Sequence, residues 1–136
     1  MNGRTATNEE IALLSERFRD FTWLKDFLVI LKTYKIIGMQ FRLNEDEDSS
    51  GAGVRMRWMT PKCQVEESFE LFPGIIVREF GFLPIGECLR GSGDPYFLKE
   101  DGGRLKLFRV LHDYSSNFTE NMVEYVSSLE SVLKNN

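Results

Sequence analysis

The chain has 136 residues and is 42% hydrophobic, with 11 Phe, 4 Tyr and 2 Trp. This length and apolar content are enough to bury a core, and they exclude a chain that is mainly disordered. The formal net charge of −4 argues against a dedicated nucleic-acid-binding protein, which normally carries a basic surplus.

The apolar runs and the cysteines indicate a cytoplasmic protein. The N-terminal stretch MNGRTATNEE is polar and does not resemble a signal peptide. The longest apolar run, Phe27–Leu31, is far shorter than the roughly 20 residues that a membrane-spanning helix needs. Cys63 and Cys88 lie far apart in unrelated surroundings, so we expect two reduced, mostly packed thiols rather than a disulfide. We therefore expect a soluble protein that does not insert into a membrane.

The N-terminal part of the chain predicts two helices. Residues 1–6 are expected to form a frayed tail, and Thr7 and Glu10 have the spacing of a capping box. From Ile11 onward, apolar residues recur at helical intervals. A broad apolar stripe then predicts a second helix over Thr22–Tyr34. This stripe is wide enough for the helix to be packed between other elements on both sides.

The middle of the chain predicts a hairpin followed by a short helix. Lys35–Leu43 is rich in β-prone residues, and Val54–Met59 alternates between apolar residues and the arginines Arg55 and Arg57. These two segments predict a hairpin with one solvated, basic face. Pro61–Phe72 fits a short helix, with its proline in the first turn.

The next part of the chain predicts further strands. We expect a strand over Ile75–Phe80, a bend near Pro84, and a second strand over Ile85–Leu89, because proline cannot donate to a strand ladder. Tyr96–Lys99 and Arg104–His112 flank the sequence EDGG, which predicts a tight hairpin turn.

The C-terminal part predicts a helix, because apolar residues recur at helical steps at Met122, Val126, Leu129 and Leu133. This helix begins either near Thr119 or only at Ser128, since Ser127 and Glu130 also have capping-box spacing. The order of elements predicts an α+β fold and a single domain over residues 1–136. Its mainly antiparallel sheet is flanked by two N-terminal helices and one C-terminal helix.

The stretch LPIGECLRGSGDPYFL, residues 83–98, contains three glycines and one aspartate between apolar runs. A phosphate-binding loop would need a lysine after the last glycine and a helix start, and neither follows here. A calcium loop would need several oxygen ligands at alternating positions, whereas Asp94 has only Glu87 nearby. We therefore interpret the glycines and Asp94 as a structural turn between two strands.

This stretch, the turn EDGG and the closing sequence VSSLESVL resemble the strand–turn–strand segment and the terminal helix of the SUKH superfamily, which includes Smi/Knr and Syd proteins. The residues that match the first motif are Ile85, Gly86, Gly91, Gly93, Asp94 and Tyr96 with the two residues after it. Ser128–Leu133 matches the terminal helix, with leucine or valine in place of phenylalanine. The resemblance implies a SUKH-like α+β fold without a catalytic centre. It also implies an immunity protein of bacterial type, which binds and neutralises a cognate polymorphic toxin, often a nuclease.

The reactive side chains independently favour a protein that is not an enzyme. His112 is the only histidine, and a histidine and the adjacent Asp113 would point to opposite faces of a strand. Cys63 and Cys88 lack a basic or Cys-x-x-Cys context that would lower the pKa of a thiol. We therefore expect no catalytic residue, no metal and no cofactor.

Four consecutive acidic residues, Glu45, Asp46, Glu47 and Asp48, equal the whole net charge of the chain. A solvated hairpin tip explains them, and so does a loop that docks on a basic toxin surface. Arg55 and Arg57, next to this loop, form a second candidate for partner binding. The alternative function is that of an intracellular regulatory or scaffold module, as in other members of the same superfamily.

Overall fold

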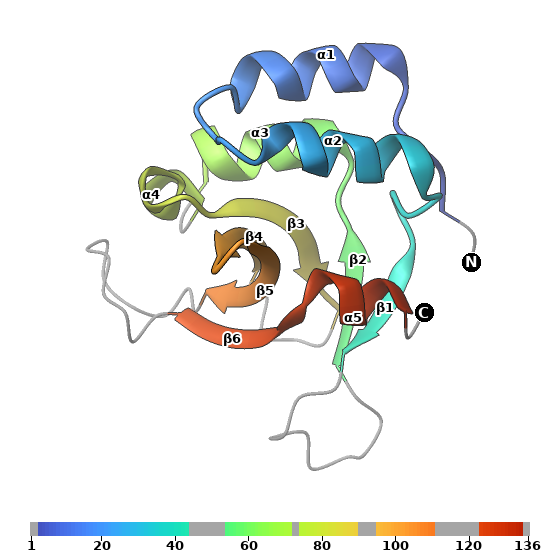
Figure 1. Cartoon of the computed structure of the whole chain (residues 1–136), viewed down its shortest axis with the longest axis vertical. Helices are drawn as coiled ribbons and strands as arrows, with labels where there is room; N and C mark the ends of the chain where they lie inside the picture. Colours follow the sequence, from blue (N-terminus) through green and yellow to red (C-terminus); the bar gives the residue numbers. More distant parts are fainter. Residues whose placement is uncertain (1–2, 44–53, 72–73, 90–94, 111–122, 135–136) are drawn as a thin grey trace.

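The computed structural model describes residues 3–43, 54–71, 74–89, 95–110 and 123–134 (Figure 1). In these residues helices pack on a curled antiparallel sheet of six strands with the order β1-β2-β3-β4-β5-β6, which confirms the predicted α+β class. The strands are β1 (Gln40–Leu43), β2 (Val54–Trp58), β3 (Leu83–Cys88), β4 (Pro95–Asp101), β5 (Arg104–Val110) and β6 (Val123–Ser128). The helices are α1 (Asn8–Arg17), α2 (Leu24–Thr33), α3 (Pro61–Phe69), α4 (Gly74–Val77), the 3₁₀ helix η1 (Arg78–Phe80) and α5 (Leu129–Lys134).

The start of the chain is fixed to the rest of the fold. Thr7 and Glu10 form the predicted capping box, which satisfies two free N–H groups at the start of α1. The tail expected over residues 1–6 is not frayed at residues 3–6, because Arg4 exchanges two backbone hydrogen bonds with Ile37 and the N–H of Ala6 donates to the carbonyl of Leu31. The Arg4 guanidinium also donates to both carboxylate oxygens of Glu10, at 2.6 and 2.8 Å.

The helices α1, α2 and α3 form a layer against one face of the sheet. Figure 1 shows α1 outermost, with α2 and α3 between it and the strands. The main core between these layers includes Phe27 and Leu31 of α2, Trp58 of β2 and Leu98 of β4, all fully buried. Trp58 stacks on Phe27, with ring centroids 6.3 Å apart. The predicted apolar stripe of the second helix is therefore buried in this core, except for Tyr34 at its end, which is exposed.

A smaller core lies on the opposite face of the sheet. Phe97 packs there with Val77, Phe82 and Val110, whereas Tyr96 and Leu98, its neighbours along β4, face the main core. This alternation is the normal consequence of the strand pleat. Because both faces of β4 are covered, residues 95–98 are all buried.

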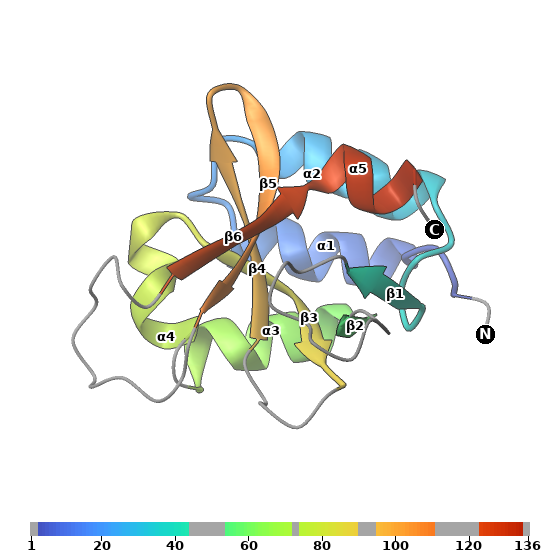
Figure 2. The same ribbon diagram turned by 90° about the horizontal axis from the view of Figure 1, so that it is seen from below.

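The sheet curls so that its two edge strands approach each other. The short helix α5 follows β6 directly and contacts β1 as well as β5 and β6. Figure 2 shows α5 on the side of the molecule where β6 ends and β1 begins. Buried Leu129 and Val132 attach α5 to the main core, so this helix closes the gap between the two edges of the sheet.

Several sequence predictions agree with the structure. The turn at EDGG joins β4 and β5, with φ of +63° at Gly102 and +80° at Gly103, as the glycine pair predicts. Pro61 occupies the first turn of α3, which Thr60 caps through its side chain. The strand predicted over Lys35–Leu43 is confirmed only for β1, because a turn at Gly38 precedes it.

The strand predicted over Ile75–Phe80 is wrong, because these residues form α4 and η1. The side chain of Glu67 accepts a hydrogen bond from the N–H of Gly74 at 3.1 Å, and the N–H of Ile75 donates to the carbonyl of Leu71 at 2.8 Å. These bonds start a helical turn that buries Val77 in the second core. β-branched residues favour strands only weakly, so tertiary contacts decide the conformation.

The proline in β3 was expected to interrupt a strand, yet β3 runs through it. Pro84 lies opposite Phe97, and the register shifts between Pro84 and Gly86, so the proline occupies an irregularity of the ladder. The carbonyl of Pro84 accepts a hydrogen bond from Nε2 of Gln64 at 2.9 Å. This bond attaches α3 to the strand.

The C-terminal helix begins late, which agrees with the second of the two predicted starts. Ser128 caps α5 by accepting a hydrogen bond from the N–H of Ser131 at 3.1 Å. The residues before it form β6 rather than the first turns of a longer helix. Pairing of β6 with β5 satisfies the backbone there and prevails over the helical spacing of Val126 and Leu129.

Candidate functional site

The residues predicted to bind a partner lie along β2 and the segment that precedes it. Glu45, Asp46, Glu47 and Asp48 lie outside the described residues. Arg55 and Arg57 are exposed on one face of β2, while Met56 between them is fully buried, as the alternation predicts. Arg57 is 3.6 Å from a carboxylate oxygen of Glu87, its neighbour on β3. This exposed pair partly neutralises the basic face.

The described residues of the family motif lie in the sheet. Ile85 and Tyr96 are fully buried in the main core, and Gly86 lies opposite Tyr96 in the ladder. A Cβ atom at Gly86 would overlap Sδ and Cγ of Met56, so glycine is required there for close packing of β3 on β2. Gly91, Gly93 and Asp94 lie outside the described residues. The three described motif residues therefore support the sheet.

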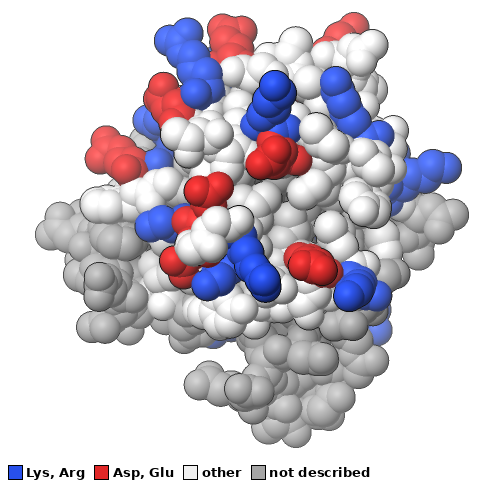
Figure 3. Space-filling model, in the orientation of Figure 1, with Lys and Arg blue, Asp and Glu red and all other residues white. Residues whose placement is uncertain are grey.

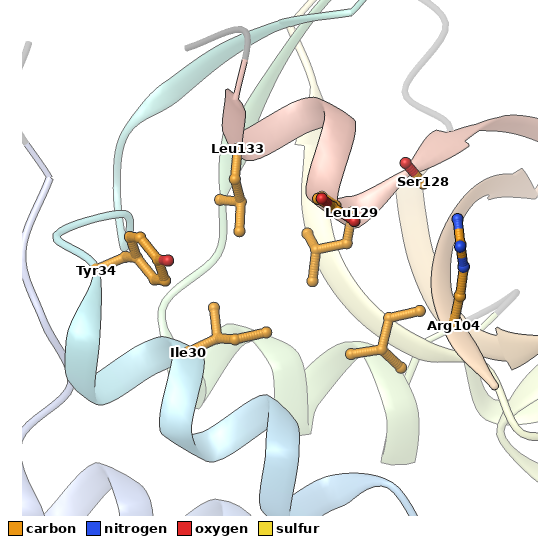
Figure 4. A pocket seen from close by; sticks show the side chains of 8 residues that line it. Ile30, Tyr34, Arg104, Ser128, Leu129 and Leu133 are labelled. Atoms are coloured by element: carbon orange, nitrogen blue, oxygen red, sulfur yellow. The ribbon is translucent and has the colours of Figure 1, made fainter.

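A groove between α2 and α5 has a largely apolar lining. Its volume is about 290 Å³, and its lining comes from α2, the start of β5 and α5 (Figure 4). The apolar residues of this lining are Ile30, Leu105, Leu129 and Leu133, and the polar ones are Tyr34, Arg104, Ser128 and Glu130. We call this site the α2–α5 groove.

The side chains of the groove converge from opposite walls. Figure 4 shows Ile30 and Tyr34 on the α2 wall, and Leu129 and Leu133 directed toward them from α5. Tyr34, directly after the end of α2, is 49% exposed. Large apolar side chains left this open are the usual mark of a binding surface when they gather in one place.

Polar groups stand at the rim of the groove. The side chains of Arg104 and Glu130 are exposed and form no ion pair or hydrogen bond with any described residue. Figure 4 shows the Tyr34 hydroxyl on the side that faces the groove. An apolar floor with a few polar groups at its rim fits a side chain of a partner, with the rim providing orientation.

A partly buried carboxyl group, that of Glu67, lies outside the groove, where α3 is joined to α4. Burial raises the pKa of Glu67 to about 7, although its hydrogen bond from the Gly74 N–H acts in the opposite direction. At the start of α1, the hydrogen bonds from Arg4 lower the pKa of Glu10 to about 2. Because both pKa values are shifted, the free energy of unfolding depends on pH through both carboxyl groups.

The α2–α5 groove was not among the sites predicted from the sequence. Tyr34, Leu129 and Leu133 stood out only as members of helical stripes, and Arg104 only as a strand residue. The signal in the sequence is that α2 is apolar beyond its buried stripe, at Val29 and Ile30. His112, considered as a catalytic base, lies outside the described residues.

The described parts of the chain contain neither a candidate metal site nor a candidate membrane-spanning helix. No group of three or more His, Cys, Asp or Glu side chains there is arranged to hold a metal ion. No helix there has the length and apolarity needed to cross a bilayer. Cys63, expected to be packed, is a free and exposed thiol on α3.

The resemblance to the SUKH superfamily is carried by the motifs in the sequence. The chain matches none of the protein-family models, curated proteins or solved structures with which it was compared.

Proposed function

We propose that this protein is a non-catalytic immunity protein that binds and neutralises a cognate toxin. The resemblance of residues 83–98 and 128–133 to the SUKH superfamily supports the immunity role. The observation that carries the proposal for binding is the α2–α5 groove, in which exposed Tyr34 and the partly exposed side chains of Ile30 and Leu133 lie beside polar groups without partners among the described residues.

The groove fits an apolar side chain presented by another protein. Its volume of about 290 Å³ is at the lower end of the range for small-molecule pockets, which is roughly 300 to 1,000 Å³. One or two partner side chains would fill it and cover Tyr34 and Leu133. Burial of an exposed apolar side chain contributes about 1.5 to 3 kcal/mol, so a few such contacts can form a binding hot spot.

Electrostatics would then guide the toxin to this protein. A toxin that acts on nucleic acid carries a basic cleft, and the acidic run of residues 45–48 is complementary to such a surface. In this proposal the acidic run accelerates association, whereas the groove slows dissociation. Arg55 and Arg57 stay candidates for contacts with acidic groups of the same partner.

The experiment is a growth-rescue assay with the genes that flank the gene of this protein. Each neighbouring gene is expressed in a test host, alone and together with this protein. Growth arrest by one neighbour, and rescue by co-expression, are expected. The rescuing complex is then purified and its dissociation constant is measured.

Two tyrosine variants form a matched pair for the groove. Tyr34→Ala is expected to weaken toxin binding at least about tenfold, because it removes an apolar wall of the groove. Tyr125→Ala removes a tyrosine that is 60% exposed on β6, away from the groove, and is expected to leave binding unchanged. Equal losses in the two variants would contradict the assignment of the groove.

The same assay separates the alternative function. A regulatory or scaffold module would bind a protein whose expression does not arrest growth. Binding of such a partner without any toxic neighbour would support that alternative and refute the immunity role.

A further inference from the structure

We propose that a second surface, where α1 ends and η1 begins, binds a carboxylate side chain of a partner protein. We call this site the Arg78 corner, and its central residues are Arg17, Phe69 and Arg78. Figures 1 and 2 both show α4, which precedes η1, and α5 on opposite sides of the molecule. The Arg78 corner thus shares no residue with the α2–α5 groove. The proposal rests on the proposed function only for the source of the carboxylate.

Two guanidinium groups are held by one aromatic ring. The guanidinium carbon of Arg78 lies 4.4 Å from the centroid of the Phe69 ring, and that of Arg17 lies 5.6 Å from it. These distances keep the two cations within about 10 Å of each other, which is close to the Debye length at 0.1 M salt. Contact with the ring orients each guanidinium plane before any ligand arrives, and such preorganisation lowers the entropic cost of binding.

The hydrogen-bonding capacity of these arginines is not used within the described residues. Nε of Arg78 is buried and has no hydrogen-bond partner there. Neither Arg17 nor Arg78 forms an ion pair within 4.0 Å with a described carboxylate. Since Nε of Arg78 is buried, an incoming carboxylate would contact the outer nitrogens of the guanidinium group.

The space beside the two guanidinium groups can admit a side chain. Two adjacent hollows of about 250 and 360 Å³ meet at Asp20 and Arg78, and Arg19, Phe21 and Gly81 also contribute to their walls. A planar guanidinium binds a carboxylate through two parallel hydrogen bonds, which makes arginine the preferred residue for this ligand.

The charges around the corner argue against a polyanion. Glu16, Asp20 and Glu79 also line the hollows and offset the charges of the three arginines. Figure 3 shows basic and acidic side chains interspersed over the face that it displays, rather than one extended basic patch. A mixed surface of this kind favours a single carboxylate in a protein over a nucleic acid, which requires a basic surplus.

Apolar side chains beside the corner indicate that the ligand is part of a protein. Leu71, Ile75 and Phe80, on and next to α4 and η1, are 45 to 50% exposed. Arginine and aromatic residues are enriched at the centres of protein interfaces. A partner segment would cover these apolar side chains while its carboxylate enters the hollow.

The test is an NMR titration of the free protein with N-acetyl-L-glutamate N-methylamide at constant ionic strength. The Nε–H signals of Arg17 and Arg78 are expected to shift and to saturate with a dissociation constant in the millimolar range. The glutamine analogue of the probe is expected to give no saturating shift. Arg78→Lys keeps the charge but loses the planar fork, and it is expected to weaken binding about tenfold, read at the Arg17 signal.

A matched variant and a second arginine keep the test decisive. Arg104→Lys makes the same change in the distant groove and is expected to leave the titration unchanged. If Arg78→Lys does not fold, Arg17→Lys is compared instead, read at the Arg78 signal. Absence of saturation, an equal response to the glutamine analogue, or unchanged affinity in the lysine variant would overturn the proposal. Since no toxin is used, this outcome is independent of the growth-rescue assay.

Discussion

The partly buried carboxyl group of Glu67 makes the stability of this protein depend on pH in an unusual direction. Its side chain is part-buried between α3 and α4, and it accepts a hydrogen bond from the Gly74 N–H at 3.1 Å. Burial raises its pKa from 4.5 to about 7. A glutamine has nearly the same shape, and its carbonyl oxygen can accept the same hydrogen bond. We therefore predict that Glu67→Gln stabilises the protein at high pH.

The direction of this pH dependence follows from the difference between the pKa values of Glu67 in the folded and the unfolded state. Below about pH 4.5, Glu67 is protonated in both the folded and the unfolded state and costs nothing. As the pH rises, the unfolded state releases its proton first, so the free energy of unfolding falls until the folded state also ionises near pH 7. The full cost is present above that pH. The advantage of glutamine should thus be near zero at about pH 4.5 and greatest at about pH 8.5.

The size of the expected stability gain follows from the raised pKa of Glu67. A difference of about 2.5 pKa units corresponds to about 3.5 kcal/mol, at about 1.4 kcal/mol per unit. Because the side chain keeps some contact with solvent, screening reduces the expected gain to about 2 kcal/mol. A gain of that size is a large fraction of the stability of a small domain.

Urea unfolding monitored by tryptophan fluorescence measures this gain, since Trp23 and Trp58 are both buried. Glu70→Gln removes one charge from an exposed side chain at the end of the same helix and controls for net charge. A Glu67→Gln advantage that does not grow between about pH 4.5 and about pH 8.5 would refute the reasoning. A loss of stability at both pH values would mean that the hydrogen bond to Gly74 dominates.

Three further predictions concern other parts of the chain. Glu10→Gln should lower the free energy of unfolding by about 1 kcal/mol near neutral pH, a small value because solvent screens the exposed Arg4 side chain. Urea unfolding should show this loss disappear as the pH falls from 4.5 toward 2, where Glu10 of the folded protein becomes protonated. Gly86→Ala should lower stability by about 1 to 3 kcal/mol in the same assay, because its Cβ overlaps buried Met56, and the loss should shrink when Met56→Ala is added. Replacing residues 45–48 by serine should slow toxin association in stopped-flow measurements more at low than at high salt, and equal rates for both proteins would remove the steering role.

Local patterns predicted those elements whose signals are complete within a few residues. The capping box at Thr7 and Glu10, the proline at the start of α3 and the glycine pair at 102–103 each fix backbone geometry without help from distant residues. The alternation around Met56 likewise placed Arg55 and Arg57 on the outer face. These predictions are all confirmed.

Where the fold depends on distant partners, the patterns were not sufficient. Val126 and Leu129 have helical spacing, but only Leu129 is in a helix, because β5 pairs with the preceding segment. Residues 75–77 read as a strand, but the carboxylate of Glu67 and the second core stabilise a helical turn there. In both places a contact that sequence spacing does not encode decided between two conformations of similar local preference.

The α2–α5 groove is a further result of distant contacts. It combines residues near positions 30, 104 and 130, and each of these has an ordinary role in its own element. The Arg78 corner similarly needs α1, α3 and η1 to meet around Phe69. Neither site contains a motif, so only the fold could bring its residues together.

The position of α5 links partner binding to the stability of the sheet. A helix as short as Leu129–Lys134 is not stable by itself, so burial of Leu129 and Val132 must hold it in place. The same helix turns Leu133 and Glu130 toward the groove and contacts both β1 and β6. A side chain seated in the groove therefore packs against the element that closes the curled sheet. Binding to the folded state alone raises its stability by mass action, and in this protein that gain would act where the two edges of the sheet meet.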